Sequence, residues 1–130
     1  MSAGDYLHHQ FQNTRKIVDR TVLAAHTSTD HADVITPRDA NHTIYIQKIT
    51  VSITTHAAQT ISFQDGAGTP VVIAAHTDAA AGLSVIEWDF GPTGTPLTAG
   101  EELDIILSAA GIAARVHIEA YERRTAVSTP

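Results

Sequence analysis

Histidines are the residues of this chain whose type suggests metal binding or acid–base chemistry, and their spacing decides whether they can do either. The chain of 130 residues contains eight histidines and no cysteine, so thiolate metal sites, disulfides and thiol nucleophiles are excluded. No two histidines alternate along one strand and no His-Glu-x-x-His motif occurs, so no metal site is predicted within one chain. A ring with one histidine from each subunit of an oligomer stays an open alternative. Two histidines lie in a polar N-terminal stretch and most others at predicted strand ends and turns: His8, His9, His26, His31, His42, His56 and His76.

Two pairs of ionisable residues alternate along predicted strands and would therefore share a strand face. His117 with Glu119 sets an imidazole beside a carboxylate, as a metal or catalytic element or as part of an exposed polar face. Glu87 with Asp89 is the best candidate for a pair of catalytic carboxylates. Glycosidases, however, place two carboxylates on either side of the scissile bond across a cleft. Two acids on one strand commonly line its solvated face, so we predict a surface position for both pairs.

None of the sequence templates for nucleophilic or nucleotide chemistry is present. The chain has no Gly-x-Ser-x-Gly nucleophile elbow, no phosphate-binding loop and no dinucleotide fingerprint. The loop Asp65-Gly66-Ala67-Gly68 lacks the several oxygen-bearing side chains of a calcium-binding loop. The sequence therefore predicts a structural or binding protein that is not an enzyme and uses no cofactor.

The elements that carry these residues are predicted to be β-strands, because from Thr21 onward apolar and polar residues alternate with a period of two. The strongest strand runs from Thr43 to Thr55. Four large side chains on its odd positions share one face: Tyr45, Ile49, Val51 and Ile53. Ile44 and Ile46 fall on the other face, and a bulge near Gln47-Lys48 would bring both sets to the core.

Further strands are predicted between turn signals, over residues 21–25, 33–36, 60–64, 71–75, 83–90, 103–108 and 112–121. Trp88 is in phase with Ile86 and Phe90 and is expected in the core; the alternative is a sugar-stacking or interface platform. About eight short strands at roughly 8–12-residue spacing predict an all-β fold. We expect an antiparallel, jelly-roll-like β-sandwich with an extended or partly helical N-terminal arm.

Three segments are expected along the chain: an arm over residues 1–28, the β-sandwich domain over 29–124 and a C-terminal tail over 125–130. Apolar residues in the first segment do not fit a helical stripe, so it is either a partly ordered tail or an arm that docks on a neighbouring subunit. The second interpretation names five interface anchors: Tyr6, Leu7, Phe11, Val22 and Leu23.

Composition narrows the classes of partner. The formal net charge is −6, and there is no basic stripe, so nucleic acid is disfavoured. No apolar run approaches the roughly 18 residues that span a bilayer, and no signal-peptide pattern opens the chain, so we expect cytoplasmic synthesis and no membrane partner. Charged residues make up only 17%, against about 25% in typical domains. Such a surface suits a protein that is largely covered by neighbours.

Three motifs follow one another between Ile44 and Glu122. Paired strands end in the glycine turn Ile61-Ser-Phe-Gln-Asp-Gly, and Gly82-Leu83 then opens a strand that ends at the aromatic Phe90. The segment from Pro96 to Ser108 reads Pro-Leu-Thr-Ala-Gly-Glu-x-Leu-x-Ile-x-Leu-Ser and precedes a closing strand. With these motifs the chain resembles small phage virion proteins of the capsid decoration (cement), jelly-roll type. The resemblance implies a trimer on the capsid surface of the virion, with the major capsid protein as partner and synthesis in the host cytoplasm.

The function expected is that of a bacteriophage virion structural protein, a capsid decoration protein that binds the outer capsid and stabilises it. The alternatives are a tail, baseplate or fibre module and a carbohydrate-binding or TNF-like β-sandwich. A glycan binder should expose Trp88 or a tyrosine beside carboxylates in a concave site. A decoration protein should instead bury its aromatic side chains and present a large apolar interface.

Overall fold

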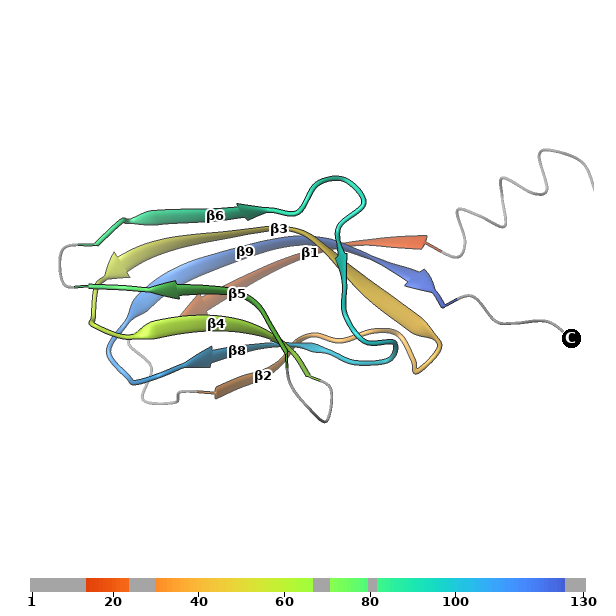
Figure 1. Ribbon diagram of the computed structural model, residues 1–130, viewed down its shortest axis with the longest axis horizontal. Coiled ribbons are helices and arrows are strands. Elements are labelled where there is room, and N and C mark those ends of the chain that lie inside the picture. The colour runs from red at the N-terminus through yellow and green to blue at the C-terminus, as the bar shows by residue number, and fades with distance from the viewer. Residues whose placement is uncertain (1–13, 24–29, 67–70, 80–81, 126–130) are drawn as a thin grey trace, which may run out of the picture.

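The computed structural model describes residues 14–23, 30–66, 71–79 and 82–125 (Figure 1). Within these ranges the regular structure is β-strand, which confirms the predicted all-β class. The strands are β1 (Thr14–Leu23), β2 (Asp30–Ile35), β3 (His42–Thr55), β4 (Thr60–Asp65), β5 (Val71–Thr77), β6 (Val85–Asp89), β7 (Thr95–Pro96), β8 (Leu103–Leu107) and β9 (Ala113–Arg124).

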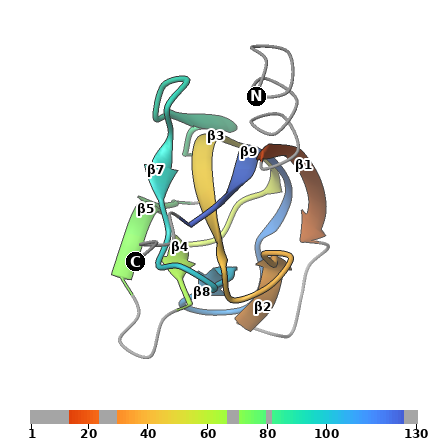
Figure 2. The same ribbon diagram turned by 90° about the vertical axis from the view of Figure 1, so that its right-hand side faces the viewer.

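The strands form two antiparallel sheets that pack face to face, as the end-on view in Figure 2 shows. Sheet A has the order β1-β9-β3-β6, and the two-residue β7 also pairs with β3. Sheet B has the order β2-β8-β4-β5. Apart from β7, the described strands thus divide four and four between two sheets in the arrangement of a jelly roll, as predicted.

The core lies between the sheets and follows the alternation of the strands. In β8 the inward residues Leu103, Ile105 and Leu107 are buried. In β9 the inward positions are likewise filled by buried apolar side chains: Ala114, Val116, Ile118 and Ala120. Each sheet therefore contributes one apolar face, and burying these faces against each other is the main stabilising term of such a sandwich.

Because β3 contains a bulge, even-numbered residues before the bulge and odd-numbered residues after it all point into the core. The register of β3 against β9 shifts between Ile46 and Lys48, so the predicted bulge is confirmed. Ile44 and Ile46 are consequently buried on the same side as Ile49. The inward position predicted for Tyr45 was wrong, because the bulge that turns its two neighbours inward turns Tyr45 outward.

The first strand begins earlier than the sequence indicated. Residues 14–23 pair with β9 along the whole of β1, whereas the strand was predicted over 21–25 inside an arm that reached residue 28. Most β1 side chains are exposed or half-buried, because β1 is an edge strand of sheet A. Such a strand shows little apolar alternation, and that hid it in the sequence.

The beginning of β1 and the end of β9 lie together at one end of the sandwich, on the right in Figure 1. Thr14 is the pairing partner of Arg123, and Arg124 is the pairing partner of His42 at the start of β3. Residues 14 and 125 therefore lie at the same end of the sandwich, which we call the terminal end.

Candidate interaction surface

A buried carboxylate ties three segments together at the terminal end. Glu122 of β9 is fully buried, and its Oε2 accepts hydrogen bonds from Arg15 Nη2 at 2.9 Å and from the backbone N–H of Arg38 at 3.0 Å. Arg38 Nε lies 3.2 Å from Oε1. Both arginine side chains are about half exposed, so they keep part of their hydration while neutralising the buried charge. The cluster therefore fixes the base of β1 and the β2–β3 connection.

A second buried carboxylate lies at the opposite end of β3. Asp78 has a completely buried side chain, and both of its oxygens lie 3.0 Å from His56 Nδ1. Burial alone would raise the pKa of Asp78, but hydrogen bonds from His56 and from the backbone N–H groups of Ala57 and Ala79 outweigh it, so the pKa lies below its usual value. His76 Nε2 is 3.6 Å from Oδ1. This cluster joins the β3–β4 and β5–β6 connections and has the form of a structural hydrogen-bond network.

The carboxylate pair predicted on β6 is accounted for by local contacts on the surface. Glu87 Oε1 lies 3.2 Å from Lys48 Nζ, and this contact is the main reason why the pKa of Lys48 is raised. Asp89 Oδ1 accepts a hydrogen bond from the N–H of Gly91 at 2.8 Å. The pair His117 and Glu119 lies half-buried on the outer face of β9. Both pairs thus have the surface positions that were predicted.

Within the described ranges, the His, Asp and Glu side chains form no group of three or more that could hold a metal ion. Asp65, in the loop compared above with a calcium site, is buried and accepts hydrogen bonds from the N–H and hydroxyl of Thr98. These contacts use the carboxylate to attach the β7–β8 connection to β4. No helix in the part of the chain that the structure describes is long and apolar enough to cross a membrane.

The single tryptophan belongs to the core, as predicted. Trp88 is half-buried and packs against the buried cluster; its ring and that of Phe63 are in a T-shaped contact with centroids 5.5 Å apart and an interplanar angle of 64°. Ile86 and Phe90 pack against the same cluster. The Trp88 ring therefore packs against the core and does not form a flat exposed surface for stacking on a sugar or a partner protein.

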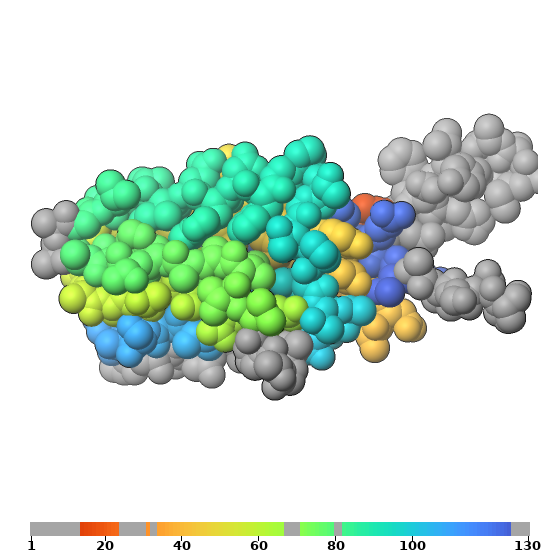
Figure 3. Space-filling model, in the orientation of Figure 1, coloured from red at the N-terminus to blue at the C-terminus, as the bar shows by residue number. Residues whose placement is uncertain are grey.

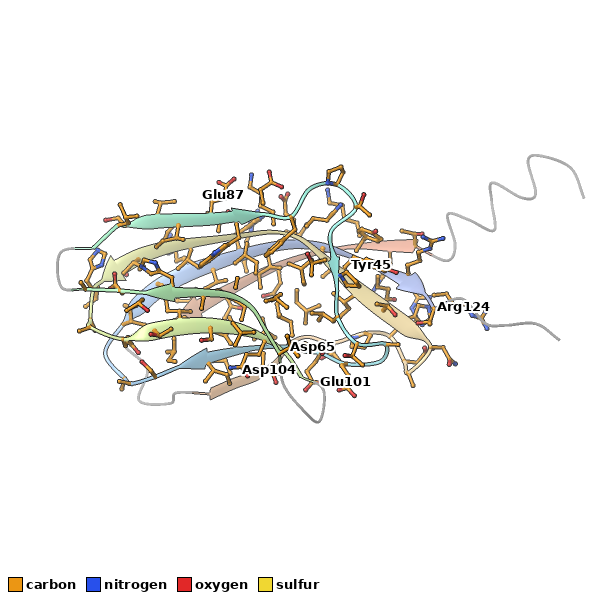
Figure 4. All side chains as sticks on the ribbon, in the orientation of Figure 1. Tyr45, Asp65, Glu87, Glu101, Asp104 and Arg124 are labelled. Atoms are coloured by element: carbon orange, nitrogen blue, oxygen red, sulfur yellow. The ribbon has the colours of Figure 1, made fainter. Side chains whose placement is uncertain are left out.

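An aromatic pair that sequence reasoning missed lies on the outer face of sheet A. Tyr45 and Tyr121 stack with centroids 4.9 Å apart and an interplanar angle of 3°, near the crossing of β7 where Figure 4 labels Tyr45. The hydroxyl of Tyr121 donates a hydrogen bond to the carbonyl of Thr93 at 2.7 Å. A shallow, open hollow of about 330 Å³ lies on the same face, lined by Lys16, Gln47, Lys48, Asp89, Gly91, Pro92 and Glu119.

Exposed apolar side chains gather on edge strands of the two sheets. Val71 and Val72 lie on β5, and Leu83 and Val85 lie at the start of β6; Figure 3 shows these two strands on one side of the molecule. On the other edge of sheet A, β1 exposes Val18 and Val22. Apolar side chains on the edges of a sheet are typical contact sites for another chain.

The two edges of sheet A also differ in charge. The outer-facing charged residues of β1 are Lys16 and Arg20, whereas those of β6 are Glu87 and Asp89. Figure 4 shows Glu87 projecting outward from β6, on the opposite margin of the molecule from Glu101. This difference could not be read from the sequence, because nothing in it shows that β1 and β6 are the two edges of one sheet.

The structure separates the five predicted interface anchors. Tyr6, Leu7 and Phe11 lie outside the described residues. Val22 is 59% exposed on β1. Leu23 is fully buried in the domain's own core, because the alternation of β1 turns it inward next to Ala114. Leu23 is therefore a core residue, and its assignment as an anchor was wrong.

Comparisons with known proteins support the fold. No protein-family model matches the chain, and no curated protein matches its sequence. A chain from the acid-stable capsid of Helicobacter pylori bacteriophage KHP30 is similar, with 6% identity, a TM-score of 0.56 and coverage of 83% of this chain and 92% of that one. The coat protein of Tobacco streak virus gives a TM-score of 0.44 at 14% identity, covering 92% and 91% of the two chains. A chain of the disulfide-linked pili of Bacillus endospore appendages gives 0.45 at 14% identity, covering 87% and 88%.

These similarities concern the fold alone, because the identities are far below the level that carries function from one protein to another. Of these three chains, the phage capsid chain has a TM-score above 0.5 and therefore carries the comparison of folds. The chain is accordingly a jelly-roll β-sandwich, and over 83% of its length the fold is similar to that of a chain of a phage capsid.

Proposed function

We propose that this chain is a bacteriophage virion structural protein that decorates the outer surface of the capsid as a trimer and stabilises the capsid there. The observation that carries the proposal is the similarity to a chain of the KHP30 capsid over 83% of this chain and 92% of that one. A phage capsid thus contains a chain of similar length and the same architecture. The low content of charged residues and the exposed apolar edges fit a protein that is covered by neighbours.

The terminal end of the sandwich is the side that we assign to the capsid. Residues 1–13 leave from it, and a chain of that length reaches at most about 45 Å when extended. This reach is sufficient for Tyr6, Leu7 and Phe11 to contact a neighbouring subunit of the shell. The cluster of Glu122 with Arg15 and Arg38 holds the base of this arm in a fixed position.

The test is co-sedimentation of the protein with purified capsids that lack it. We expect the full chain to bind, to saturate at a fixed stoichiometry and to raise the temperature at which the capsids disrupt. A variant without residues 1–13 should fold, because β1 is kept, but should bind at least tenfold more weakly. The matched control is the triple substitution Tyr6→Ala, Leu7→Ala and Phe11→Ala, which keeps the length of the arm. A full chain that neither co-sediments with capsids nor raises their disruption temperature would contradict the proposal.

A second candidate function is glycan binding, as in a tail, baseplate or fibre module. It is favoured by the hollow on sheet A, which Asp89 and Glu119 help to line, and by the stacked pair of Tyr45 and Tyr121, since Tyr121 follows Glu119 by two residues on the same face of β9. Carboxylates next to an aromatic surface are the groups that sugars bind. Titration with a glycan panel, followed by tyrosine fluorescence and by the chemical shifts of residues 45 and 121, tests this function. Binding that is abolished by Asp89→Asn would favour it over capsid decoration.

A further inference from the structure

We propose that copies of this chain associate head to tail through the two edges of sheet A, with β6 of one copy beside β1 of the next, in a closed ring. The occupant of each edge is therefore a second copy of the same chain. The closure of the ring as a trimer rests on the function proposed above, whereas the contact itself rests on strand order, register and charge.

Strand order makes the contact a continuation of the sheet. Sheet A ends at β1 on one side and at β6 on the other. The pairs β1–β9, β9–β3 and β3–β6 are all antiparallel, so β6 runs opposite to β1. A copy moved sideways across the sheet would therefore add its β1 antiparallel to β6 of its neighbour. Addition of a strand at a sheet edge is a common mode of protein association.

The register of the sheet then aligns complementary residues. Each strand pairing relates one residue to its neighbour, so a row can be followed from β6 through β3 and β9 to β1. One row runs through Glu87, Thr50, His117 and Arg20. The row two residues earlier along β6, on the same face of the sheet, runs through Val85, Ser52, Arg115 and Val22. A copy at the same height sets Glu87 beside Arg20 of the next copy and Val85 beside Val22 of the next copy.

Both pairs consist of residues that are exposed in the single chain. Val85 and Val22 are 60% and 59% exposed, so their contact would remove apolar surface from water. Arg20 is exposed, and the exposed Glu87 carboxylate contacts Lys48 through one oxygen, which leaves acceptor sites for a guanidinium. Asp89 would lie in the next row, diagonal to Lys16 and Arg20 of the next copy.

Charge also argues against the two symmetric alternatives. A two-fold contact of β6 with β6 would bring Glu87 and Asp89 against the same acids. A two-fold contact of β1 with β1 would bring Lys16 and Arg20 against the same bases. Like charges opposite each other on neighbouring strands are destabilising. The head-to-tail contact is the one that pairs unlike charges, and such heterologous contacts close into rings when the rotation allows it.

Charge reversal tests the contact in the full-length protein. Arg20→Glu and Glu87→Arg should each raise the protein concentration at the midpoint of assembly by a factor of about 100 or more, because like charges across an interface cost several kcal/mol. The double variant with both substitutions should regain the oligomer, since the charges are exchanged. Glu101→Lys, in the connection before β8, is the matched control and should keep the wild-type mass. Mass is measured by light scattering over a concentration series, against 13.8 kDa for one chain.

Each variant is also checked for folding by its thermal unfolding curve, which should match that of the wild type at concentrations where both are dissociated, because both side chains are exposed. A wild type of 13.8 kDa at all concentrations, or single variants that keep the wild-type mass, would overturn the inference. A double variant that stays as dissociated as the single ones would overturn it too. Co-sedimentation with capsids, measured separately, reports on the proposed function alone, so the two failures are distinguishable.

Discussion

Arg15 Nη2 lies 2.9 Å from Oε2 of Glu122, although 107 residues separate the two along the chain. The contact joins the first residues of the edge strand β1 to the last residues of β9. Glu122 also accepts the backbone N–H of Arg38, so a single buried carboxylate holds three segments that are remote in sequence. The terminal end of the sandwich depends on this one side chain.

Glu122→Gln should lower the free energy of unfolding by about 1–3 kcal/mol, because the amide keeps the shape of the side chain but loses the ionic hydrogen bonds. Replacing Arg15 and Arg38 together by Ala should cost more, about 3–5 kcal/mol, because it leaves a buried carboxylate without a charged partner. Urea unfolding followed by Trp88 fluorescence measures both. A double arginine variant that is more stable than Glu122→Gln would show that the cluster is not held by charge.

Asp78 should make the protein acid-sensitive in a defined range. Its pKa is lower in the folded chain than in the unfolded one, so its stabilising effect is fully present above the unfolded pKa, near 3.9, and is lost as the pH falls towards the folded pKa. Asp78→Asn should lower stability at neutral pH and flatten the decline below about pH 4. Free energies of unfolding between acid and neutral pH check this.

Asp39 provides the control for that experiment. Its pKa is also lowered, chiefly by the hydrogen bond from His42 and then by the backbone N–H of Asn41. The Asp39 side chain is exposed, however, and exposed ion pairs contribute little to stability. Asp39→Asn should therefore leave the pH profile nearly unchanged. Equal effects of the two substitutions would mean that burial is not what gives Asp78 its importance.

Gly100 should tolerate a side chain less well than Gly91. Both have positive φ, +78° and +81°, so alanine is strained at either position by about 1–2 kcal/mol. A Cβ at Gly100 would also lie 3.0 Å from the Cα of Ala40, whereas a Cβ at Gly91 meets nothing within 4 Å. Gly100→Ala should consequently lower the melting temperature by several degrees more than Gly91→Ala. Calorimetry of the two variants side by side decides this.

Phe63 should be the side chain on which the environment of Trp88 depends. It is fully buried and contacts the tryptophan edge to face, so Phe63→Ala should cost about 3–5 kcal/mol. The resulting space next to Trp88 should make its fluorescence more accessible to a small quencher. Phe63→Leu keeps most of the volume and should have the smaller effect on both measurements. Unchanged quenching in Phe63→Ala would contradict the packing described.

The sequence predicted the fold best where burial imposes a pattern on a strand. Isoleucines on both faces of β3 required a bulge, and every second residue from Ile112 to Ala120 is apolar and buried, which is the pattern of an inward strand face. The position of Glu122 was also encoded, because it continues that inward series by one further step and ends it with a charge. A charged residue in the phase of the core indicates a buried ion pair, although its partners cannot be named from sequence.

Other features depend on topology and could not be predicted. The edge strand β1 lacks a strong apolar pattern, so it was assigned to the arm, and Leu23 was assigned to an interface with it. The network of His56 with Asp78 joins two connections whose proximity follows from the order of sheet B. The complementary edges of sheet A become visible only when β1 and β6 are known to end the same sheet.

The position of β9 between β1 and β3 has a consequence for how the chain is made. β9 is synthesised after every other described strand, so β1 and β3 emerge from the ribosome without the strand that joins them. β4 and β5 are neighbours in both sequence and space and can pair as soon as they exist. In sheet A, β3 can pair with β6 before β9 is made, but β1 pairs with β9 and cannot join the sheet until then. Such long-range pairing is slow. Until β9 is made, the nascent chain exposes strands that can pair with strands of neighbouring nascent copies. The risk of intermolecular mispairing is therefore greatest during synthesis on crowded ribosomes.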